Sequence, residues 1–404
     1  MQLKKNIVLL IFLSFVIRLL SAYFFHDSKI ENEWGILLNN LVQFQTYSLY
    51  SEGSFLIPSV LMPPLYAYFI YAIKILTFNS INFIYILIFV QIIISTLSVY
   101  FFYKINFKTF SKQICLINSY IFSIFPLNFY AAGQVSSITL QIFLLLLFFL
   151  FTFKVSENKN LKNYLSFSLL ASLLTLIRGE FILIYLFTLF YMFINNKIKI
   201  KNLILVGLLT LLFISPYLAK NYNTFNKIIL VKSLGINLWK GNNEFSKIQG
   251  YENLENKNFE NIKYEIENLE KDVLYELKRD KIFLNAAIKN IKEKPLDYSY
   301  LFFKKMFAFY FFDFKSNYPN YYNLFHIVPV LIISIISFLG LILILNEKEF
   351  KLAYLKNYML LTVIIFSIFF ILPRYKLTIL PVQIMFVGYF LEYLFKKFSS
   401  NINK

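Results

Sequence analysis

Apolar residues gather into long runs that are separated by short stretches rich in lysine and asparagine. A helix needs about 20 apolar residues to cross the ~30 Å core of a bilayer, and a shorter run can cross where the bilayer thins. We therefore expect an all-α polytopic membrane protein with about ten spans. The predicted spans are residues 6–25, 81–103, 114–132, 137–153, 164–178, 180–196, 203–219, 324–345, 355–372 and 377–395.

The composition agrees with this pattern. The chain has 404 residues, of which 58% are hydrophobic, and a mean hydropathy of +0.60, more apolar surface than a soluble domain of this size buries. The net charge of +18 fits lysines in cytoplasmic loops and near anionic lipids, so we do not expect nucleic acid as a partner. A single cysteine, Cys115, and two distant histidines, His26 and His326, argue against a metal site built from these residues.

Basic residues predict which side of the membrane each loop occupies. Lysines stand at both ends of the chain, at Lys4, Lys5, Lys396 and Lys397, and cytoplasmic loops carry an excess of lysine and arginine. An even number of spans then leaves both ends in the cytoplasm of an inner membrane. The run of residues 1–25 could be a cleaved signal peptide, but its length and Arg18 favour a retained anchor.

This scheme divides the chain into three parts. Residues 1–219 form an N-terminal transmembrane module whose first outer loop is 26–80, residues 220–323 form a second outer region, and residues 324–404 contain the last spans. Residues 63–78 are expected to form a helix in or re-entering the outer interface. The alternative is a short true span, which would move the basic loop 104–112 to the outside.

The second outer region contains a polar segment, residues 244–297, with charges at helical spacing. We expect it to be a small exposed helical insert rather than a catalytic domain. The aromatic stretch 295–314, which also contains Asp313, suits a helix in the membrane interface.

Charged residues at the predicted outer face form the one constellation that suggests chemistry. They are Arg18, Asp27, Glu31, Glu33, Arg178, Glu180, Lys220, Arg374 and Lys376. An arginine can hold a phosphate with two parallel hydrogen bonds, and a carboxylate can remove a proton from an acceptor hydroxyl. Each cation taken alone could instead reach toward lipid headgroups from a helix end.

Short strings in this chain follow one another in an order that is similar to a known family. The strings are Arg18; Glu33-Trp34 with Leu41 and Tyr47-Ser48; Pro63-Pro64-Leu65-Tyr66; Phe125-Pro126 with Tyr130 and Gly133; Leu176-Ile177-Arg178-Gly179-Glu180; Ser215-Pro216-Tyr217 with Asn221-Tyr222; Asn237-Leu238-Trp239-Lys240-Gly241-Asn242-Asn243; and Arg374-Tyr375-Lys376-Leu377 with Pro381. The chain resembles the C-type glycosyltransferases, in the bacterial branch similar to dolichyl-phosphate-mannose protein mannosyltransferases and lipid A aminoarabinose transferases. The matches spread over most of the chain.

The resemblance implies a C-type glycosyltransferase fold and an active site that faces the periplasm or the exterior. It implies a polyprenyl-phosphate sugar as donor substrate, inversion at the anomeric carbon, and no metal or other cofactor. The acid of the first outer loop would be the base, which makes Glu33 and Glu31 the candidate catalytic residues. Basic residues near helix ends would hold the donor phosphate, and the candidates are Arg374, Lys376, Arg178 and Lys220.

Some positions depart from the family pattern. Family members usually carry an acid after the third span, where this chain has Ile138. The expected Asp of the first loop would align near Ile30, so the sequence leaves Glu31 and Glu33 as alternatives. The missing second acid leaves altered acceptor handling or lost activity open.

The sequence thus predicts a membrane glycosyltransferase that moves a sugar from a polyprenyl-phosphate donor to a lipid, glycan or protein acceptor. One alternative is a transporter or flippase of lipid-linked sugars, which would place charges in the middle of spans and show a pseudo-repeat. The other is an inactive homologue that acts as a scaffold.

Overall fold

The computed structural model describes residues 2–30, 32–78, 82–315 and 323–402. These residues form helices joined by short loops, together with one two-stranded hairpin. The α-helices are α1 Gln2–Phe25, α2 Glu33–Phe44, α3 Pro64–Leu76, α4 Phe83–Phe107, α5 Lys112–Ile124, α6 Pro126–Ala132, α7 Ile138–Glu157, α8 Leu161–Ile177, α9 Phe181–Ile194, α10 Ile200–Phe225, α11 Leu234–Gly241, α12 Glu260–Glu267, α13 Tyr275–Glu293, α14 Pro295–Tyr310, α15 Leu324–Ile344, α16 Phe350–Ser367 and α17 Leu380–Ile402. The 3₁₀ helices are η1 Lys257–Phe259 and η2 Pro373–Thr378, and the strands are β1 Ser48–Glu52 and β2 Phe55–Pro58.

Each predicted span overlaps at least one helix along most of its described length, which confirms the all-α membrane fold class. Within the described part of the chain, six helices are long and apolar enough to cross a membrane: α1, α4, α7, α10, α15 and α16. A seventh span is possible if α5 and α6 count as one, although Pro126 follows a break there and the two helices are bent by 52°.

Three further apolar helices are shorter. Helices α8 and α9 have 17 and 14 residues, or about 25 and 21 Å at 1.5 Å per residue. Helix α3 has only 13 residues and begins at Pro64, so at about 20 Å it is too short to cross a core of ~30 Å without thinning the bilayer. Its length agrees with an interfacial or re-entrant helix rather than a full span.

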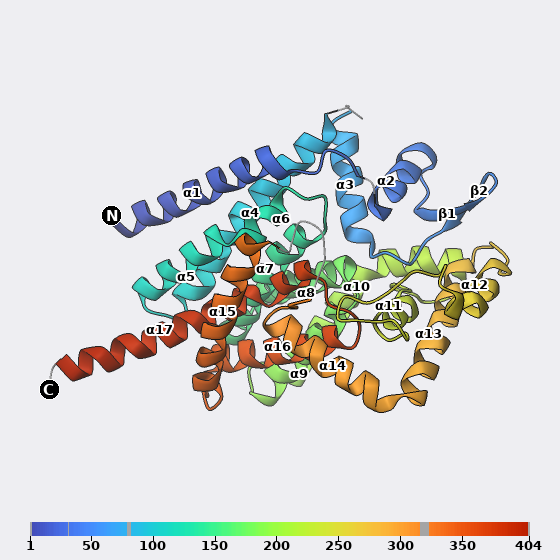
Figure 1. The fold of residues 1–404 in the computed structure, drawn as a ribbon. Coiled ribbons are helices and arrows are strands. Elements are labelled where there is room, and N and C mark those ends of the chain that lie inside the picture. The colour runs from blue at the N-terminus through green and yellow to red at the C-terminus, as the bar shows by residue number, and fades with distance from the viewer. Residues whose placement is uncertain (1, 31, 79–81, 316–322, 403–404) are drawn as a thin grey trace.

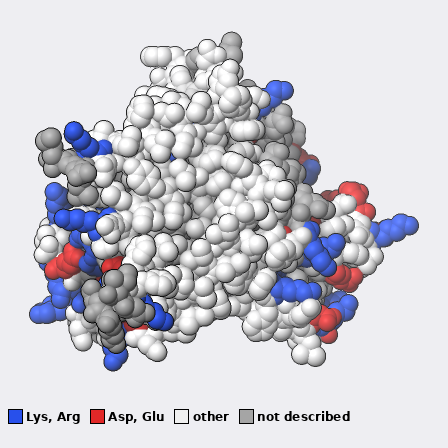
Figure 2. Space-filling view, turned by 60° about the vertical axis from the view of Figure 1, so that its left-hand side comes forward, with Lys and Arg blue, Asp and Glu red and all other residues white. Residues whose placement is uncertain are grey.

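The helices lie side by side with both ends of the chain at one end of the bundle (Figure 1). The hairpin and helices α11, α12 and α13 lie at the opposite end (Figure 1). Figure 2 shows a broad band of uncharged residues between two edges that carry lysines, arginines and carboxylates. This distribution suits a bundle whose middle lies in hydrocarbon and whose ends lie in water.

The two outer regions pack against each other. Glu276, in the first turn of α13, is buried and accepts hydrogen bonds from the backbone nitrogens of Val60 and Leu61, at 2.7 and 2.9 Å. Arg279 donates a hydrogen bond to the Tyr50 hydroxyl and lies between the rings of Tyr50 and Phe283. Part of the segment 244–297, which was expected to be an exposed insert, is therefore buried and packs against the first outer loop.

The hairpin is an element that the sequence pattern did not predict. Its strands pair antiparallel across a turn in which Gly53 has a φ of +56°, a conformation that residues with a β-carbon rarely adopt. The strands are only five and four residues long, too short for an alternating pattern to stand out from a loop.

Candidate active site

Asp27 is the carboxylate of the first outer loop that the fold holds in place. It follows the end of α1 and is half-buried. Its Oδ2 accepts a hydrogen bond of 2.7 Å from the backbone nitrogen of Val135, and its own backbone nitrogen donates to the carbonyl of Gly133 at 3.0 Å. Burial raises the pKa of Asp27, while the hydrogen bond from Val135 and the neighbouring His26 oppose the shift. These contacts fix Asp27 to the turn between α6 and α7.

A chain of side-chain hydrogen bonds ties the same turn to the first outer loop. The Gln91 amide donates to the carbonyl of Gln134 at 2.8 Å and accepts from the Tyr66 hydroxyl at 2.8 Å. The Tyr66 ring meets Trp34 edge to face, with 5.0 Å between ring centroids. Helices α2, α3 and α4 are thereby held in one arrangement around the Asp27 turn.

The predicted base residues lie elsewhere in that loop. Glu33 begins α2 and is exposed, and no ion pair joins it to a described cation. The preceding Asn32 caps the helix through a hydrogen bond from the backbone nitrogen of Trp34, at 3.1 Å. Glu31 lies outside the described residues. The choice between Glu31 and Glu33 stays a prediction, whereas the partners of Asp27 are defined.

Two of the four predicted phosphate ligands meet at one aromatic ring. The guanidinium of Arg178, between α8 and α9, lies 4.3 Å from the centre of the Tyr375 ring and 5.0 Å from that of Phe366. Arg374 lies 6.0 Å from the centre of the same Tyr375 ring. Both arginines are half-buried. Residues almost 200 positions apart in the chain thus place two positive charges beside one ring.

One carboxylate, Glu180, lies near Arg178. The Arg178 Nη2 atom is 3.7 Å from Glu180 Oε1, and the two side chains are 14% and 24% exposed. A 3.7 Å separation is longer than a charge-assisted hydrogen bond of 2.7–2.9 Å, so Glu180 compensates Arg178 only loosely. Two guanidinium groups at such a half-buried position suit a phosphate, which can accept hydrogen bonds from both.

Lys376, the third predicted ligand, has a different environment. It is buried, and its ammonium donates to the carbonyl oxygens of Phe309, Tyr310 and Phe311 and to Ser334 Oγ at 2.9 Å. These carbonyls end α14, where a helix has unpaired acceptors and a partial negative charge. The ammonium has three donors and all are engaged. We therefore reassign Lys376 from phosphate binding to capping α14.

Lys220, the fourth predicted ligand, is exposed at the end of α10. Its ammonium donates to the Tyr68 hydroxyl at 2.7 Å and lies 5.5 Å from the centre of the Tyr47 ring. The rings of Tyr47 and Tyr68 stack, with centroids 5.7 Å apart. Lys220 thus belongs to a separate aromatic cluster between α10, α3 and the first outer loop.

The string Asn237 to Asn243, the most specific part of the resemblance, holds α11 against the loop after α16. The amide of Asn242 donates to the carbonyls of Leu238 and Ile368, at 2.8 and 2.9 Å. A β-carbon at Gly241 would stand 2.1 Å from the carbonyl oxygen of Phe369, so only glycine fits. These contacts dock α11 on the loop after α16, which leads directly to Arg374 and Tyr375.

Arg18 is also structural. It is completely buried and donates to Ser95 Oγ at 2.7 Å, to Ser14 and to the carbonyl of Ser123 at 3.1 Å. It therefore joins α1, α4 and α5 inside the bundle. The sequence pattern could not separate this role from a place in the outer-face constellation.

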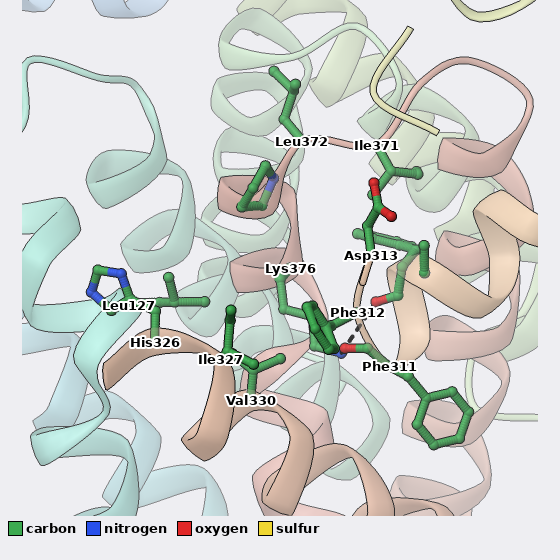
Figure 3. A pocket seen from close by; sticks show the side chains of 13 residues that line it. Leu127, Phe311, Phe312, Asp313, His326, Ile327, Val330, Ile371, Leu372 and Lys376 are labelled. Atoms are coloured by element: carbon green, nitrogen blue, oxygen red, sulfur yellow. Dashed lines mark hydrogen bonds between the residues drawn. The ribbon is translucent and has the colours of Figure 1, made fainter. Parts of the chain in front are cut away.

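A small cavity lies between α6, the end of α14, the start of α15 and η2 (Figure 3). Its volume is about 40 Å³. The polar side chains that line it are Asp313, His326 and Lys376, and the apolar lining includes Leu127 of α6 and Ile371. Sequence reasoning had placed Asp313 in an interfacial helix and had considered His326 only as a metal ligand. The signal that it lacked was proximity, since Leu127 and Asp313 are far apart in the chain.

Comparisons with known proteins address the fold. Residues 61–219 match the family model described as dolichyl-phosphate-mannose-protein mannosyltransferase. No curated protein sequence matches the chain. Solved structures of the Archaeoglobus fulgidus oligosaccharyltransferase do match in three dimensions.

The oligosaccharyltransferase AglB from that organism, in complex with an inhibitory peptide and a dolichol-phosphate, has a TM-score of 0.56 and 15% identity, and the match covers 98% of this chain and 50% of that one. The apo form of the Archaeoglobus fulgidus enzyme has a TM-score of 0.58 and 12% identity over 98% of this chain and 51% of that one. A form tethered to an acceptor peptide gives 0.59 and 14%, over 98% and 50%.

The chain spans about half the length of these solved proteins, and identities this low bear on the fold alone. The two kinds of match point to one superfamily, since the family model covers residues 61–219 and the structural match extends over nearly the whole chain. The resemblance seen in the sequence is confirmed: the chain matches the dolichyl-phosphate-mannose-protein mannosyltransferase family over residues 61–219 and has the fold of the C-type glycosyltransferases.

Proposed function

We propose that this protein transfers a sugar from a polyprenyl-phosphate donor to a lipid, glycan or protein acceptor. The family match and the fold support a glycosyltransferase with a lipid-linked donor. One of the matching structures holds an inhibitory peptide and a dolichol-phosphate, and the latter is a lipid phosphate of the expected kind.

The observation that carries the proposal is the arrangement around α6. The turn after α6 binds Asp27, and η2, which packs against α6 and α7, carries Arg374 and Tyr375. Arg178 reaches the same ring from α8. A carboxylate able to take a proton and a pair of guanidinium groups able to hold a phosphate therefore lie on neighbouring elements.

The proposed reaction follows from these charges. Arg178 and Arg374 hold the donor phosphate and stabilise the charge that it gains as the bond between the anomeric carbon and the phosphate oxygen breaks. An acceptor hydroxyl attacks the anomeric carbon from the opposite face, so the configuration inverts, and the carboxylate takes the hydroxyl proton. The products are the glycosylated acceptor and the polyprenyl phosphate.

We assign the carboxylate to the first outer loop and favour Asp27 over Glu33 and Glu31. Asp27 is half-buried and hydrogen-bonded, which orients its oxygens, while Glu33 is exposed. Burial raises the pKa of Asp27, and a base with a raised pKa binds the acceptor proton more strongly. The side of the membrane is inferred from the lysines: both chain ends would be cytoplasmic, and this site would face outward.

The test is sugar transfer in proteoliposomes from a radiolabelled polyprenyl-phosphate sugar. Asp27→Asn should lower kcat by about 100-fold or more, the range expected for loss of a general base. Because the pKa of Asp27 is raised, the kcat/KM of the wild type should increase with pH in a range above the pKa of an ordinary aspartate. Asp27→Asn should lose this increase. Glu33→Gln is the matched control.

The outcomes separate the assignments. Unchanged turnover in Asp27→Asn together with a large loss in Glu33→Gln or Glu31→Gln would return the base to the glutamates. Absence of turnover by the wild type with each donor tested would favour the scaffold alternative over a transferase.

A further inference from the structure

The cavity beside α6 contains a buried carboxylate that the proposed reaction does not yet use. Asp313 is 9% exposed and stands just after α14. Its Oδ1 accepts a hydrogen bond of 3.0 Å from the backbone nitrogen of Lys315. Among the described cations, none lies within ion-pair distance of it. A buried carboxylate without a cation is unfavourable, so the fold alone gives little reason for Asp313.

Lys376, the cation among the described residues that line the same cavity, is engaged by other acceptors. The Lys376 ammonium is directed to the carbonyls of Phe309, Tyr310 and Phe311 and to Ser334. Figure 3 shows Asp313 and His326 on opposite sides of the cavity, with Lys376 between them. His326 is held at the start of α15, where its backbone nitrogen binds the Asn323 side chain at 3.0 Å.

The cavity adjoins the elements that hold the proposed base. The ring of Tyr130, on α6, lies 5.3 Å from the His326 ring and 6.5 Å from that of Phe25, two residues before Asp27. The two carboxylates, Asp27 and Asp313, therefore flank α6, a helix of seven residues and about 10 Å.

The size of the cavity limits what it can hold. One water molecule needs a cavity volume of about 10–15 Å³ on the same scale. The cavity, at about 40 Å³, therefore suits a hydroxyl or hydroxymethyl group but not a whole sugar. A carboxylate accepts the hydrogen bond of a hydroxyl, and an imidazole can either donate to it or accept from it.

We propose that Asp313 and His326 form a polar subsite that binds a hydroxyl group of the acceptor or of the transferred sugar, and so helps to set substrate specificity. The subsite rests on the proposed glycosyltransferase function.

The first test needs no turnover. Asp313→Asn removes an uncompensated buried charge but keeps the shape, so the melting temperature of the ligand-free protein should stay unchanged or rise. A carboxylate that only stabilises the fold would make the same variant melt several degrees lower, and that result would overturn the subsite. Asp297→Asn, which changes an exposed aspartate of α14, is the matched control.

The second test uses transfer from a radiolabelled polyprenyl-phosphate sugar. Asp313→Asn and His326→Gln should each raise a KM by about 10-fold or more, as for one lost hydrogen bond to a charged or polar partner. A rise confined to the donor KM assigns the hydroxyl to the transferred sugar, and a rise confined to the acceptor KM assigns it to the acceptor. Normal KM values for both substrates would overturn the subsite while leaving the proposed function intact. Wild-type protein without turnover would overturn both.

Discussion

Two groups of buried or half-buried cations occur in this protein, and they differ in what surrounds them. Arg18, Lys305 and Lys376 are fully enclosed and bind protein oxygens. Arg178 and Arg374 are half-buried and lie beside the Tyr375 ring, with Glu180 as a loose partner of Arg178. The sequence shows all five simply as basic residues in or near apolar runs.

The enclosed group shares one role, which is to cap helix ends. Lys305 donates to the carbonyl of Gly241, the last residue of α11, at 2.7 Å, and Lys376 binds the last carbonyls of α14. Arg18 binds the carbonyl of Ser123, in the last turn of α5. A helix C-terminus carries unpaired carbonyls and a partial negative charge, so a cation is a suitable cap where water is absent. The half-buried pair, Arg178 and Arg374, lies instead beside an aromatic ring, a position that suits binding of an external anion.

The largest effect on folding is expected at Lys376. Lys376→Met would leave the buried carbonyl of Phe309 without a donor, and the carbonyls of Tyr310 and Phe311 with one each, from Gln383 and Ser334. An unsatisfied buried carbonyl costs about 1–3 kcal/mol, so the free energy of unfolding should fall by about 2–3 kcal/mol. Thermal unfolding in detergent would show this as a much lower melting temperature or as loss of folded protein. Lys304→Met, which changes an exposed lysine of α14, should melt like the wild type. A stable Lys376→Met variant with a raised donor KM would reverse our reassignment.

At Arg178 and Arg374 we expect a large loss of donor affinity and a smaller loss of stability. Arg374→Ala and Arg178→Ala should each raise the donor KM by about 10–100-fold, because a hydrogen bond between a charged group and phosphate contributes roughly 1.5–3 kcal/mol. The melting temperature should fall less than in Lys376→Met, since Arg178 and Arg374 are half-buried and Lys376 is buried. Arg374→Lys should recover only part of the affinity, because lysine cannot bind phosphate with two parallel bonds. Equal losses of stability and affinity would place this pair with the enclosed cations.

The smallest effect is expected at Lys220. Its contacts with Tyr68 and Tyr47 are exposed, and a cation beside an aromatic ring at such a site contributes about 0.5–1 kcal/mol. Lys220→Ala should therefore change the donor KM by no more than about 5-fold in the same transfer assay. A loss as large as that of Arg374→Ala would mean that Lys220 also holds the donor phosphate and that the site extends to α3 and α10.

The string from Asn237 to Asn243 shows what resemblance can and cannot predict. It was the most specific match in the sequence and correctly indicated the family fold. The side chains of Asn242 and Asn243, however, bind the backbone of α11 and of the loop after α16, which is a structural role. A string can be shared within a family because the fold depends on it, and the letters alone do not separate that reason from catalysis.

Some residues of the candidate site could be named from the sequence and others could not. Arg178 and Arg374 could be named from the sequence, because charges at the ends of apolar runs are conspicuous. Asp313 could not be selected, because Leu127 and Ile371, which line the same cavity, come from α6 and from the loop after α16, far away in the chain. Asp27 was visible in the constellation, but nothing in the order of residues showed that it binds the turn at Val135 while Glu33 lies exposed.

The sequence by itself determined that this chain is a helical membrane protein, because the length and polarity of each run set its transfer into hydrocarbon without reference to the other runs. It also determined which superfamily the chain resembles. Only the tertiary structure decided which charges are caps and which are candidates for binding substrate. The physical reason is that the state of a buried ion depends on the oxygens and charges within a few ångströms of it, and in a bundle those partners come from helices far apart in the chain.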